Sequence, residues 1–484
     1  MAIKELSDKE IRGRFQSDNP WWEKKKDYRA EQSYRRHYFS PLFEQASQRA
    51  IRRAVLLMGP RRVGKTVLLH QVIEQFIARD IEASKILYCS LDDPVFLGLP
   101  LERLVACFLE GNNIADDEEY FVFFDEIQYL TNWEIHLKSL VDRRPKGKFI
   151  ASGSAAAALR AQSAESGAGR FSDFLLPPMN FKEFVDLRIG DAAGLVDRTS
   201  DVESRVEEFN ELFFQYINFG GFPEMAIGDL TSDQISKFVG GDIIEKALSR
   251  DLPNIYGIAD FRDLAQFFRV IAFNSGQEIS PGELAQSTGL TAPTIEKFFT
   301  YLEAAFLVRR IYKIDRSAKR FKRASRFKVY LTNPSLRSAM FGFSAPDDQD
   351  VGLVIETAFL AQWRPGSFGE EPVYAHWDTG EVDFVVLHPG TQKPRRIYEV
   401  KWSDRMARNG DVLKPLISFA KKHRLKSAIM SSRTHYGTIE AGNIKVHVWP
   451  TSVLAYIQAT VQTDPNPHKE LRTILGDAAP LGDA

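Results

Sequence analysis

The sequence predicts an α/β protein whose first half is built on a buried, largely parallel β-sheet. From residue 53 to about residue 190, short apolar strands alternate with amphipathic helical segments, which is the pattern of βαβ units. A glycine-rich loop follows the first of these strands, and two adjacent acidic residues end a later one. These three observations together favour a phosphate-binding sheet domain with further domains after it.

The expected strands are short and almost wholly apolar, as strands buried on both faces are. They read AVLLM, ILYCSL, FVFF, FIAS and FLL, at residues 54–58, 86–91, 121–124, 149–152 and 174–176. Helical segments are expected between them, at residues 65–79, 101–110, 133–142 and 154–161. Because each helix carries the chain back across the sheet, neighbouring strands are expected to run parallel.

The composition is that of a globular protein with more than one domain. The chain has 484 residues, of which 44% are hydrophobic and 26% are charged, so roughly two to four domains are expected. The 63 basic and 64 acidic residues nearly cancel, so the net charge indicates no particular partner. The two cysteines, Cys89 and Cys107, lie in apolar segments and predict neither a disulfide framework nor a zinc cluster.

Neither a signal peptide nor a membrane segment is predicted. The first residues, MAIKELSDKEIRGRF, are charged and lack the apolar stretch of a secretion signal. No run approaches the roughly 18 apolar residues that span a bilayer. We therefore expect a cytoplasmic protein that does not engage a membrane.

Residues 59–66 fit the phosphate-binding pattern G-x-x-x-x-G-K-[ST] in full, between an expected strand and an expected helix. Backbone N–H groups of such a loop, and the positive end of the helix dipole, surround a phosphate group. Lys65 is expected to reach the β- and γ-phosphates of ATP, and the Thr66 hydroxyl to bind Mg²⁺. The alternative is a glycine-rich turn that only begins a helix. The expected ATP-binding residues are Gly59, Pro60, Arg61, Arg62, Val63, Gly64, Lys65 and Thr66.

Two acids follow the apolar strand FVFF, namely Asp125 and Glu126. Ligands of an open parallel sheet bind at the carboxyl ends of its strands. Asp125 is expected to hold Mg²⁺, and Glu126 to polarise the water that attacks the γ-phosphate. A solvated strand end is the alternative, but the complete phosphate-binding loop upstream favours the catalytic interpretation.

Polar groups near the end of the expected sheet add further candidates. Ser152 and Ser154 follow the strand FIAS; either can contact the γ-phosphate or the water, or can cap the next helix instead. Arg170 is a candidate arginine finger, acting in cis or on a neighbouring subunit, with an ordinary salt bridge as the alternative. Arg61 and Arg62, within the loop itself, are weaker candidates for that role.

Several segments together resemble a known family. GPRRVGKT, LDDP, FVFFDEIQYLTNWEIHLKSLVD, ASGS, GRFSDFLLPPMNFKEF, NFGGFPE and SRDLPNIYGI are similar to a group of bacterial and archaeal AAA+ ATPases. That group has a DEIQ-type Walker B segment and a C-terminal domain related to the PD-(D/E)xK nucleases. The resemblance runs from about residue 50 to residue 455 and implies an AAA+-like core, a winged-helix domain and a nuclease-like domain. The roles of the group are diverse, so no single purpose is implied.

The expected organisation has five parts. They are an N-terminal helical extension (1–48), an AAA+-like P-loop ATPase core (49–235), a winged-helix domain (236–340), a PD-(D/E)xK-like α/β domain (341–460) and a flexible tail (461–484).

A helix-turn-helix is expected in the middle domain. Ser280 and Glu283 have the spacing of a capping box, and Gly289 suits the turn between the helices. The second helix carries Glu296 and Glu303, a poor composition for lying against phosphates. These helices are therefore expected to act as a lid or in packing.

The strands after these helices are strongly basic and contain interleaved aromatic residues. Such a wing suits phosphate backbones and exposed bases, and a solvated run of charges is the alternative. The basic residues are Arg309, Arg310, Lys313, Arg316, Lys319, Arg320, Lys322, Arg323, Arg326 and Lys328, with Tyr312, Phe321 and Phe327 among them.

A second charged constellation is expected near the C-terminus. Period-two alternation places Glu399 and Lys401 on one face of the strand IYEVKW, and a hairpin would bring Asp383 alongside them. Asp383 and Glu399 can hold Mg²⁺ while Lys401 orients the attacking water. By spacing alone a solvated hairpin is the alternative. The resemblance implies the pattern E…D…ExK of the nucleases, with Glu356 as its first member.

The expected function is that of an ATP-hydrolysing AAA+ protein, a homo-oligomer that remodels DNA, moves along it or migrates its branches, with ATP and Mg²⁺ as cofactors. A Mg²⁺-dependent nuclease activity is the expectation for the C-terminal domain. One alternative is a nucleotide-dependent signalling or defence switch whose C-terminal domain binds DNA or protein without cutting. Another is a protein-remodelling ATPase that uses no nucleic acid.

Overall fold

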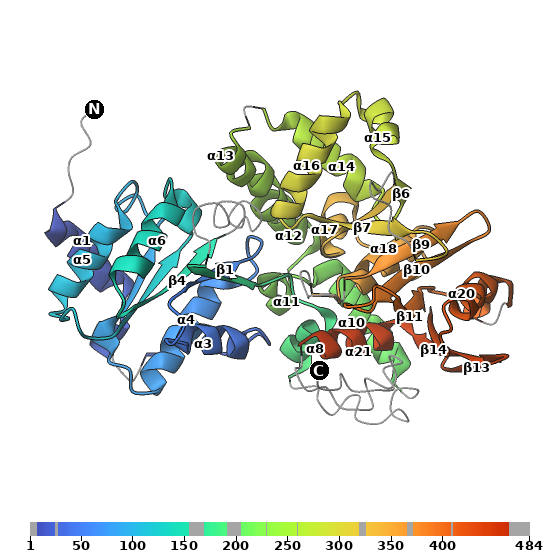
Figure 1. Cartoon of the computed structure of the whole chain (residues 1–484), viewed down its shortest axis with the longest axis horizontal. Coiled ribbons are helices and arrows are strands. Elements are labelled where there is room, and N and C mark those ends of the chain that lie inside the picture. The colour runs from blue at the N-terminus through green and yellow to red at the C-terminus, as the bar shows by residue number, and fades with distance from the viewer. Residues whose placement is uncertain are drawn as a thin grey trace. The chain divides into compact units, whose positions relative to one another are not determined.

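The computed structural model describes residues 7–24, 28–153, 169–190, 205–228, 230–258, 260–318, 326–364, 371–407 and 410–463. The chain forms two compact units, which Figure 1 shows with their elements labelled. Unit 1 comprises residues 1–176 and 250–259, and unit 2 comprises residues 177–249 and 260–484. Among the helices described, none is long and apolar enough to cross a membrane.

Unit 1 is built on a five-stranded sheet in which every pair of neighbouring strands is parallel. The strand order is β2-β3-β4-β1-β5, and the predicted α/β class and parallel sheet are confirmed. Because β4 separates β1 from β3, the carboxyl ends of these three strands adjoin at one edge. The strands are β1 (Ala54–Met58), β2 (Ile86–Ser90), β3 (Tyr120–Asp125), β4 (Gly147–Gly153) and β5 (Phe171–Leu175).

Among the described residues, three helices of unit 1 connect one of these strands to the next. The expected helices at 65–79, 101–110 and 133–142 form within a residue of the predicted ends, whereas 154–161 lies outside the described residues. The helices are α1 (Asp8–Asp18), α2 (Trp21–Lys24), α3 (Phe39–Ser47), α4 (Lys65–Ala78), α5 (Leu101–Gly111), α6 (Trp133–Arg143) and α13 (Leu252–Tyr256).

The N-terminal extension is fastened to strand β2. The Asn19 side chain exchanges two hydrogen bonds with the backbone of Tyr88, of 3.0 and 2.7 Å, and Trp21 Nε1 donates to the Ile86 carbonyl at 3.0 Å. Trp21 and Asn19 are fully buried. The extension is therefore part of the core of unit 1.

Unit 2 is built on a mixed nine-stranded sheet of order β13-β14-β12-β11-β10-β9-β7-β8-β6. Strand β7 pairs in parallel with β9, Lys313 lying opposite Tyr374, so the sheet runs across the expected boundary at residues 340 and 341. The strands are β6 (Glu278–Ile279), β7 (Val308–Ile314), β8 (Phe327–Leu331), β9 (Val373–Trp377), β10 (Gly380–Leu387), β11 (Pro394–Glu399), β12 (Ser427–Ser432), β13 (Gly437–Ala441) and β14 (Ile444–Pro450).

The helix-turn-helix forms as predicted. Ser280 and Glu283 make the reciprocal hydrogen bonds of a capping box, and Gly289 ends the first helix at a φ of 72°. It comprises α15 (Pro281–Thr288) and α16 (Ala292–Ala304). The other α-helices described in unit 2 are α8 (Phe181–Ile189), α10 (Val206–Phe219), α11 (Pro223–Ile227), α12 (Ser232–Lys237), α14 (Arg262–Phe273), α17 (Ser335–Phe341), α18 (Val351–Leu360), α19 (Asp404–Ala407), α20 (Gly410–Lys422) and α21 (Thr451–Thr463).

Candidate functional sites

The phosphate-binding loop connects β1 to α4 in a tightly restricted backbone path. A Cβ atom at Gly59 would lie 2.3 Å from the Leu176 carbonyl oxygen, and Gly64 has a φ of 96°, a region in which side chains are strained. The Lys65 ammonium donates to the carbonyl oxygens of Gly59 (3.1 Å) and Pro60 (3.0 Å) and is buried. Burial lowers the Lys65 pKa. A buried cation at a helix N-terminus fits a triphosphate.

Asp125 is the centre of a hydrogen-bond network at the carboxyl edge of this sheet. Its Oδ2 accepts from the Thr66 hydroxyl (2.6 Å) and from the Tyr88 hydroxyl (2.8 Å), while Oδ1 accepts from the Ser152 hydroxyl. Thr66, Asp125 and Ser152 were predicted to share one site, and the structure brings them together. Tyr88 was missed, although a hydroxyl within an otherwise apolar strand is a signal that points to it.

Glu126 follows Asp125 in a left-handed backbone conformation, with a φ of 53°. Its backbone N–H donates to Ser152 Oγ at 3.2 Å, and its carboxylate accepts from the Gln128 side chain. Burial raises the Glu126 pKa, and the nearby Asp125 raises it further against the opposing effect of Lys65. A carboxylate with a raised pKa beside a phosphate loop is suited to accept a proton from water.

Arg61, in the middle of the loop, is held by a residue far along the chain. Its Nε donates to Asp251 Oδ2 at 2.5 Å and its Nη2 to Asp251 Oδ1 at 2.6 Å. Asp251 is only 7% exposed. Next to it, the Arg250 guanidinium lies 5.2 Å from the centre of the Tyr129 ring. Arg250 and Asp251 therefore lie beside Tyr129 and the phosphate-binding loop; the sequence indicated their segment, SRDLPNIYGI, only through the family resemblance.

The remaining arginine-finger and sensor candidates are placed as follows. Arg170 precedes β5 and pairs with Asp142 in the same unit, which is the arrangement expected of the salt-bridge alternative. Arg62 lies in the loop at a φ of 62°. Ser154 lies outside the described residues. A finger role for Arg170 stays a prediction.

The structure also brings together the four residues of the predicted C-terminal constellation. Asp383 Oδ2 accepts from the Val400 backbone at 2.8 Å and from Lys401 Nζ at 3.2 Å. Lys401 Nζ lies 2.8 Å from Glu399 Oε1. Glu356, on α18, is close enough for the Asp383 charge to raise its pKa.

A second ammonium, which the sequence placed in a DNA-binding wing, lies in this constellation. Lys328 Nζ is 2.6 Å from Glu381 Oε1, 3.6 Å from Glu356 Oε2 and 3.9 Å from Asp383 Oδ1. Only 8% of the Lys328 side chain is exposed. We call the six residues the C-terminal charge cluster: Lys328, Glu356, Glu381, Asp383, Glu399 and Lys401.

The residues of this cluster do not fit a Mg²⁺ ion as they are arranged. Within the described ranges, no group of three or more His, Cys, Asp or Glu side chains is placed to hold a metal ion. Burial, with the Asp383 charge, raises the pKa of Glu356 to about 7 and that of Glu399 to about 8. Glu399 Oε1 contacts Lys401, whereas Glu399 Oε2 is buried without a hydrogen-bond partner.

Within the described residues, most basic side chains of the predicted wing have partners inside unit 2, and its role in binding nucleic acid stays a prediction. Arg309 is buried and donates to the Trp363 carbonyl. Arg310 pairs with Glu296 and Glu303. The reason is tertiary: both strands are paired on each side within the nine-stranded sheet, so their side chains meet acids of neighbouring elements. Lys313 and Arg326 pair with Glu278, and Arg326 also with Glu283; Lys319, Arg320, Phe321, Lys322 and Arg323 lie outside the described residues.

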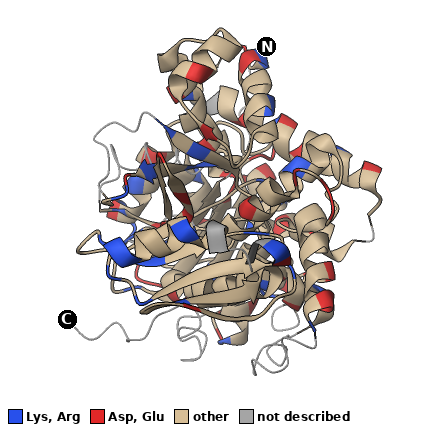
Figure 2. Ribbon diagram, turned by 90° about the vertical axis from the view of Figure 1, so that its right-hand side faces the viewer, with Lys and Arg blue, Asp and Glu red and all other residues tan. Residues whose placement is uncertain are grey.

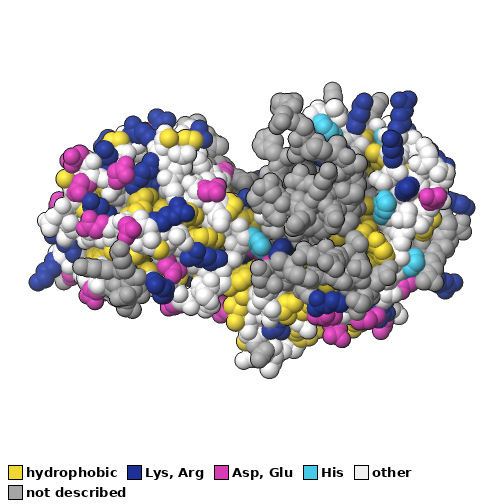
Figure 3. Space-filling model, turned by 90° about the horizontal axis from the view of Figure 1, so that it is seen from below, with side chains coloured by type: hydrophobic (Ala, Val, Ile, Leu, Met, Phe, Trp, Pro, Cys, Tyr) yellow, Lys and Arg dark blue, Asp and Glu magenta, His cyan; other side chains and the backbone are white. Residues whose placement is uncertain are grey.

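Exposed basic residues gather instead where the β7–β8 connection meets the end of α20. Arg316 donates to Ser418 Oγ at 2.5 Å, and its carbonyl lies 2.9 Å from His423 Nε2. Figure 2 faces this end of unit 2 and shows basic segments along the helix in the foreground. In unit 1, by contrast, basic and acidic side chains are interspersed on the face that Figure 3 shows. We call the exposed basic residues the α20 basic cluster: Arg316, Lys421, Lys422, Arg424 and Lys426.

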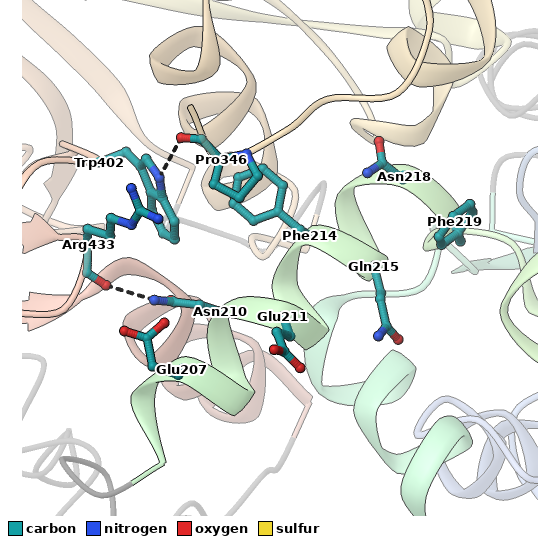
Figure 4. Close-up of a pocket in the computed structure, with 10 residues that line it drawn as sticks. All are labelled: Glu207, Asn210, Glu211, Phe214, Gln215, Asn218, Phe219, Pro346, Trp402 and Arg433. Carbon is teal, nitrogen blue, oxygen red and sulfur yellow. Dashed lines mark hydrogen bonds between the residues drawn. The ribbon is translucent and has the colours of Figure 1, made fainter. Parts of the chain in front are cut away.

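A pocket of about 360 Å³ lies elsewhere in unit 2, between α10 and the residues after β11 (Figure 4). The Trp402 ring contacts Phe214 edge-on, and its Nε1 donates to the Pro346 carbonyl at 3.1 Å. The Arg433 guanidinium lies 5.9 Å from the centre of the same ring. Trp402 is thus engaged by its neighbours, and the pocket holds none of the predicted site residues.

Residues 51–185, which include the five-stranded sheet and the phosphate-binding loop, are similar to a known family. These residues match a family model described as "AAA domain", and residues 210–347 match one described as a domain of unknown function, DUF8612. The predicted nucleotide-binding class is confirmed, while neither match indicates a nuclease.

Relatives of the chain occur in archaea and bacteria. An uncharacterized protein of Methanocaldococcus jannaschii is 24% identical over 360 residues, which cover 72% of this chain and 76% of that protein. An uncharacterized protein of Haemophilus influenzae is 23% identical over 293 residues, which cover 59% of this chain and 69% of that protein. The crystal structure of Cdc6p from Pyrobaculum aerophilum matches 68% of this chain and 97% of its own, with 13% identity and a TM-score of 0.28.

Proposed function

We propose that the chain hydrolyses ATP with Mg²⁺ at the site around Asp125 and uses the energy to act on DNA through unit 2. The main support for this ATP site is the hydrogen bond of 2.6 Å that the Thr66 hydroxyl donates to Asp125. It joins the end of the phosphate-binding loop to the acid that ends β3, the two groups that hold Mg²⁺ in P-loop enzymes.

Each residue of this site has a role in the proposed reaction. Lys65 and the backbone N–H groups of the loop bind the phosphate oxygens, and Thr66 with Asp125 would hold Mg²⁺, which neutralises developing charge on the phosphates. Glu126 orients the attacking water and takes its proton. Ser152 accepts from the Glu126 backbone N–H and donates to the Asp125 carboxylate, so it links the two residues at the edge of the sheet.

DNA is proposed as the partner because of the α20 basic cluster. Its members come from two segments that are about a hundred residues apart in the sequence, one at Arg316 and one at residues 421–426. Such convergence of exposed cations from separate elements is suited to a phosphate backbone. Arg310, by contrast, is not suited to bind a phosphate backbone, because Glu296 and Glu303 already neutralise its charge.

For the C-terminal charge cluster, the non-cutting role is favoured over the nuclease role. The motif of the nucleases is complete, but Lys328 already pairs with the carboxylates that would bind a metal ion. We therefore propose a domain that contacts DNA without cleaving it. Assembly into a homo-oligomer, with Arg170 acting on a neighbouring site, is part of the same proposal.

The test is the ATPase rate of the full chain with and without single-stranded, duplex and branched DNA. We expect at least one DNA form to stimulate the rate, with binding that weakens as salt increases. Reversing the charges of Arg316, Lys421 and Lys422 should abolish the stimulation and leave the basal rate unchanged.

Lys297→Glu is the matched control, because Lys297 is exposed on α16, outside the α20 basic cluster. It should retain the stimulation. Equal stimulation of the parent and the triple variant would refute the DNA surface. The absence of any salt-sensitive DNA binding would favour the protein-remodelling ATPase instead.

A further inference from the structure

The most unusual group of unit 2 is the buried ammonium of Lys328. It comes from β8, whereas the carboxylates around it come from β10 and α18. Within 4 Å of its Nζ lie carboxylate oxygens of Glu356, Glu381 and Asp383. The Tyr374 ring, 5.5 Å from Nζ to its centre, closes another side. Lys328 is thus enclosed by acceptors and not aimed at solvent.

The Lys328 ammonium lies between the carboxylates of Glu356 and Asp383, where a metal ion bound by both acids would lie. The two acids belong to the predicted Mg²⁺-binding constellation, and the ammonium approaches one oxygen of each. The other Asp383 oxygen is already used by Val400 and Lys401. A divalent ion that bound to both acids would have to displace the ammonium or lie against it.

The charge of the cluster leads to the same conclusion. Buried carboxylates are stable only when cations or hydrogen bonds compensate them. Here Lys328 compensates Glu381, Glu356 and Asp383, and Lys401 compensates Asp383 and Glu399. Glu381 is not part of the E…D…ExK pattern, and it makes the shortest contact to Lys328. Lys328 is therefore held by an acid that the predicted metal site does not use.

We propose that the Lys328 ammonium replaces the divalent cation in the C-terminal charge cluster, so that unit 2 keeps the nuclease-like arrangement without binding a catalytic metal ion. This inference deepens the proposed non-cutting role of unit 2. Lys328 acts through the carboxylates and is a positioning residue: it joins β8 to β10 and α18 and leaves the cluster closed to Mg²⁺.

The experiment is metal rescue of a Lys328 variant. Lys328→Met removes the ammonium and leaves the acids without that cation, so the variant should melt at a lower temperature than the parent in EDTA. Added Mn²⁺ should restore much of the loss in Lys328→Met and should shift the parent little. In titration calorimetry, the variant should gain a Mn²⁺ site that the parent lacks at this position.

Two further variants make the result specific. Lys328→Met/Asp383→Asn should lose the gained site, which separates it from Mn²⁺ binding around Asp125 in unit 1. Lys313→Met is the matched control, because Lys313 lies on the neighbouring strand and pairs with Glu278 outside the cluster; its melting temperature should not respond to Mn²⁺ more than that of the parent. If Lys328→Met does not fold, Lys328→Gln serves in the same assay.

The proposal is overturned if the parent itself binds Mn²⁺ in a manner that Asp383→Asn abolishes, or cleaves DNA with Mg²⁺ and loses cleavage in Asp383→Ala. It is also overturned if Mn²⁺ rescues neither Lys328 variant. If DNA does not stimulate the ATPase rate of the parent, but Mn²⁺ rescues the Lys328 variants as expected, only the proposed function fails. The two failures are therefore distinguishable.

Discussion

Arg61 of the phosphate-binding loop and Asp251 form a two-point ion pair, with both nitrogen–oxygen distances at or below 2.6 Å. The pair spans 190 positions of the chain and attaches the segment 250–259 to the ATP site. That segment continues at both ends into unit 2. The ion pair therefore attaches to the phosphate-binding loop a short segment of unit 1 that is flanked on both sides in the sequence by residues of unit 2.

Breaking this pair should destabilise unit 1. Asp251→Ala leaves the largely buried Arg61 guanidinium unpaired, so we expect a loss of about 1–3 kcal/mol in the free energy of unfolding, measured with urea. Arg61→Met/Asp251→Ala should cost less than the sum of the single changes. The control is Asp233→Ala, which removes an exposed pair with Lys237 and should change stability by less than about 1 kcal/mol. Equal losses in the two Asp variants would contradict the structural role of the pair.

Two substitutions separate nucleotide binding from hydrolysis. Lys65→Ala removes the buried ammonium of the phosphate loop, so we expect ATP binding to be lost in a fluorescent-nucleotide titration. Glu126→Gln keeps the shape of the side chain but cannot accept the proton of water, so it should bind ATP and hydrolyse it at least about a hundredfold more slowly. Normal turnover in either variant would show that the catalytic site lies elsewhere.

Tyr88 is expected to position Asp125 without contacting ATP. Tyr88→Phe removes one hydrogen bond to Asp125 Oδ2, so kcat should fall by about tenfold while KM changes little. Tyr120→Phe is the matched control, since the Tyr120 hydroxyl is buried without a hydrogen-bond partner. A change in KM alone would place Tyr88 in nucleotide binding instead.

Gly59 is required by a close approach of two backbone segments. In Gly59→Ala the new methyl group would lie 2.3 Å from the Leu176 carbonyl oxygen, so either the loop or the chain after β5 must move. We expect a loss of about 1–3 kcal/mol in stability together with weaker ATP binding. The control is Gly13→Ala in α1, where no atom lies within 4 Å and helix propensity should increase stability by about 0.5–1 kcal/mol.

The pH dependence of stability should report on Glu399. Burial, with the Asp383 charge, raises its pKa from 4.5 to about 8 in the folded chain, so between these values the folded state binds more protons than the unfolded state. Stability is therefore lost as pH rises through that window. The difference in unfolding free energy between the parent and Glu399→Gln should fall from about pH 5 to about pH 8 in EDTA. Exposed Glu211→Gln should leave the slope of the parent unchanged.

The local chemistry of the chain was enough to predict much of the fold. The five strands of unit 1 were found from short apolar runs, and the capping box of Ser280 with Glu283 from its spacing, because both depend on neighbouring residues. The phosphate-binding loop is likewise a continuous segment. Residues of the C-terminal pattern were brought together as expected, since a hairpin places Asp383 near Glu399 and Lys401.

What the sequence by itself determined is the class of the protein: an AAA-type ATPase domain whose loop and strand-end acids are readable from consecutive residues. Only the tertiary structure decided the partners of the charged side chains. Lys328 and Arg310 cannot be told apart in a run of basic residues. In the structure, Lys328 lies among the carboxylates of β10 and α18, whereas Arg310 pairs with Glu296 on α16. The contacts of Asp251 with Arg61 and of Tyr88 with Asp125 were likewise visible only in the tertiary structure. The reason is that an ion pair depends on distance in space, and the packing of segments that are far apart in the sequence sets that distance.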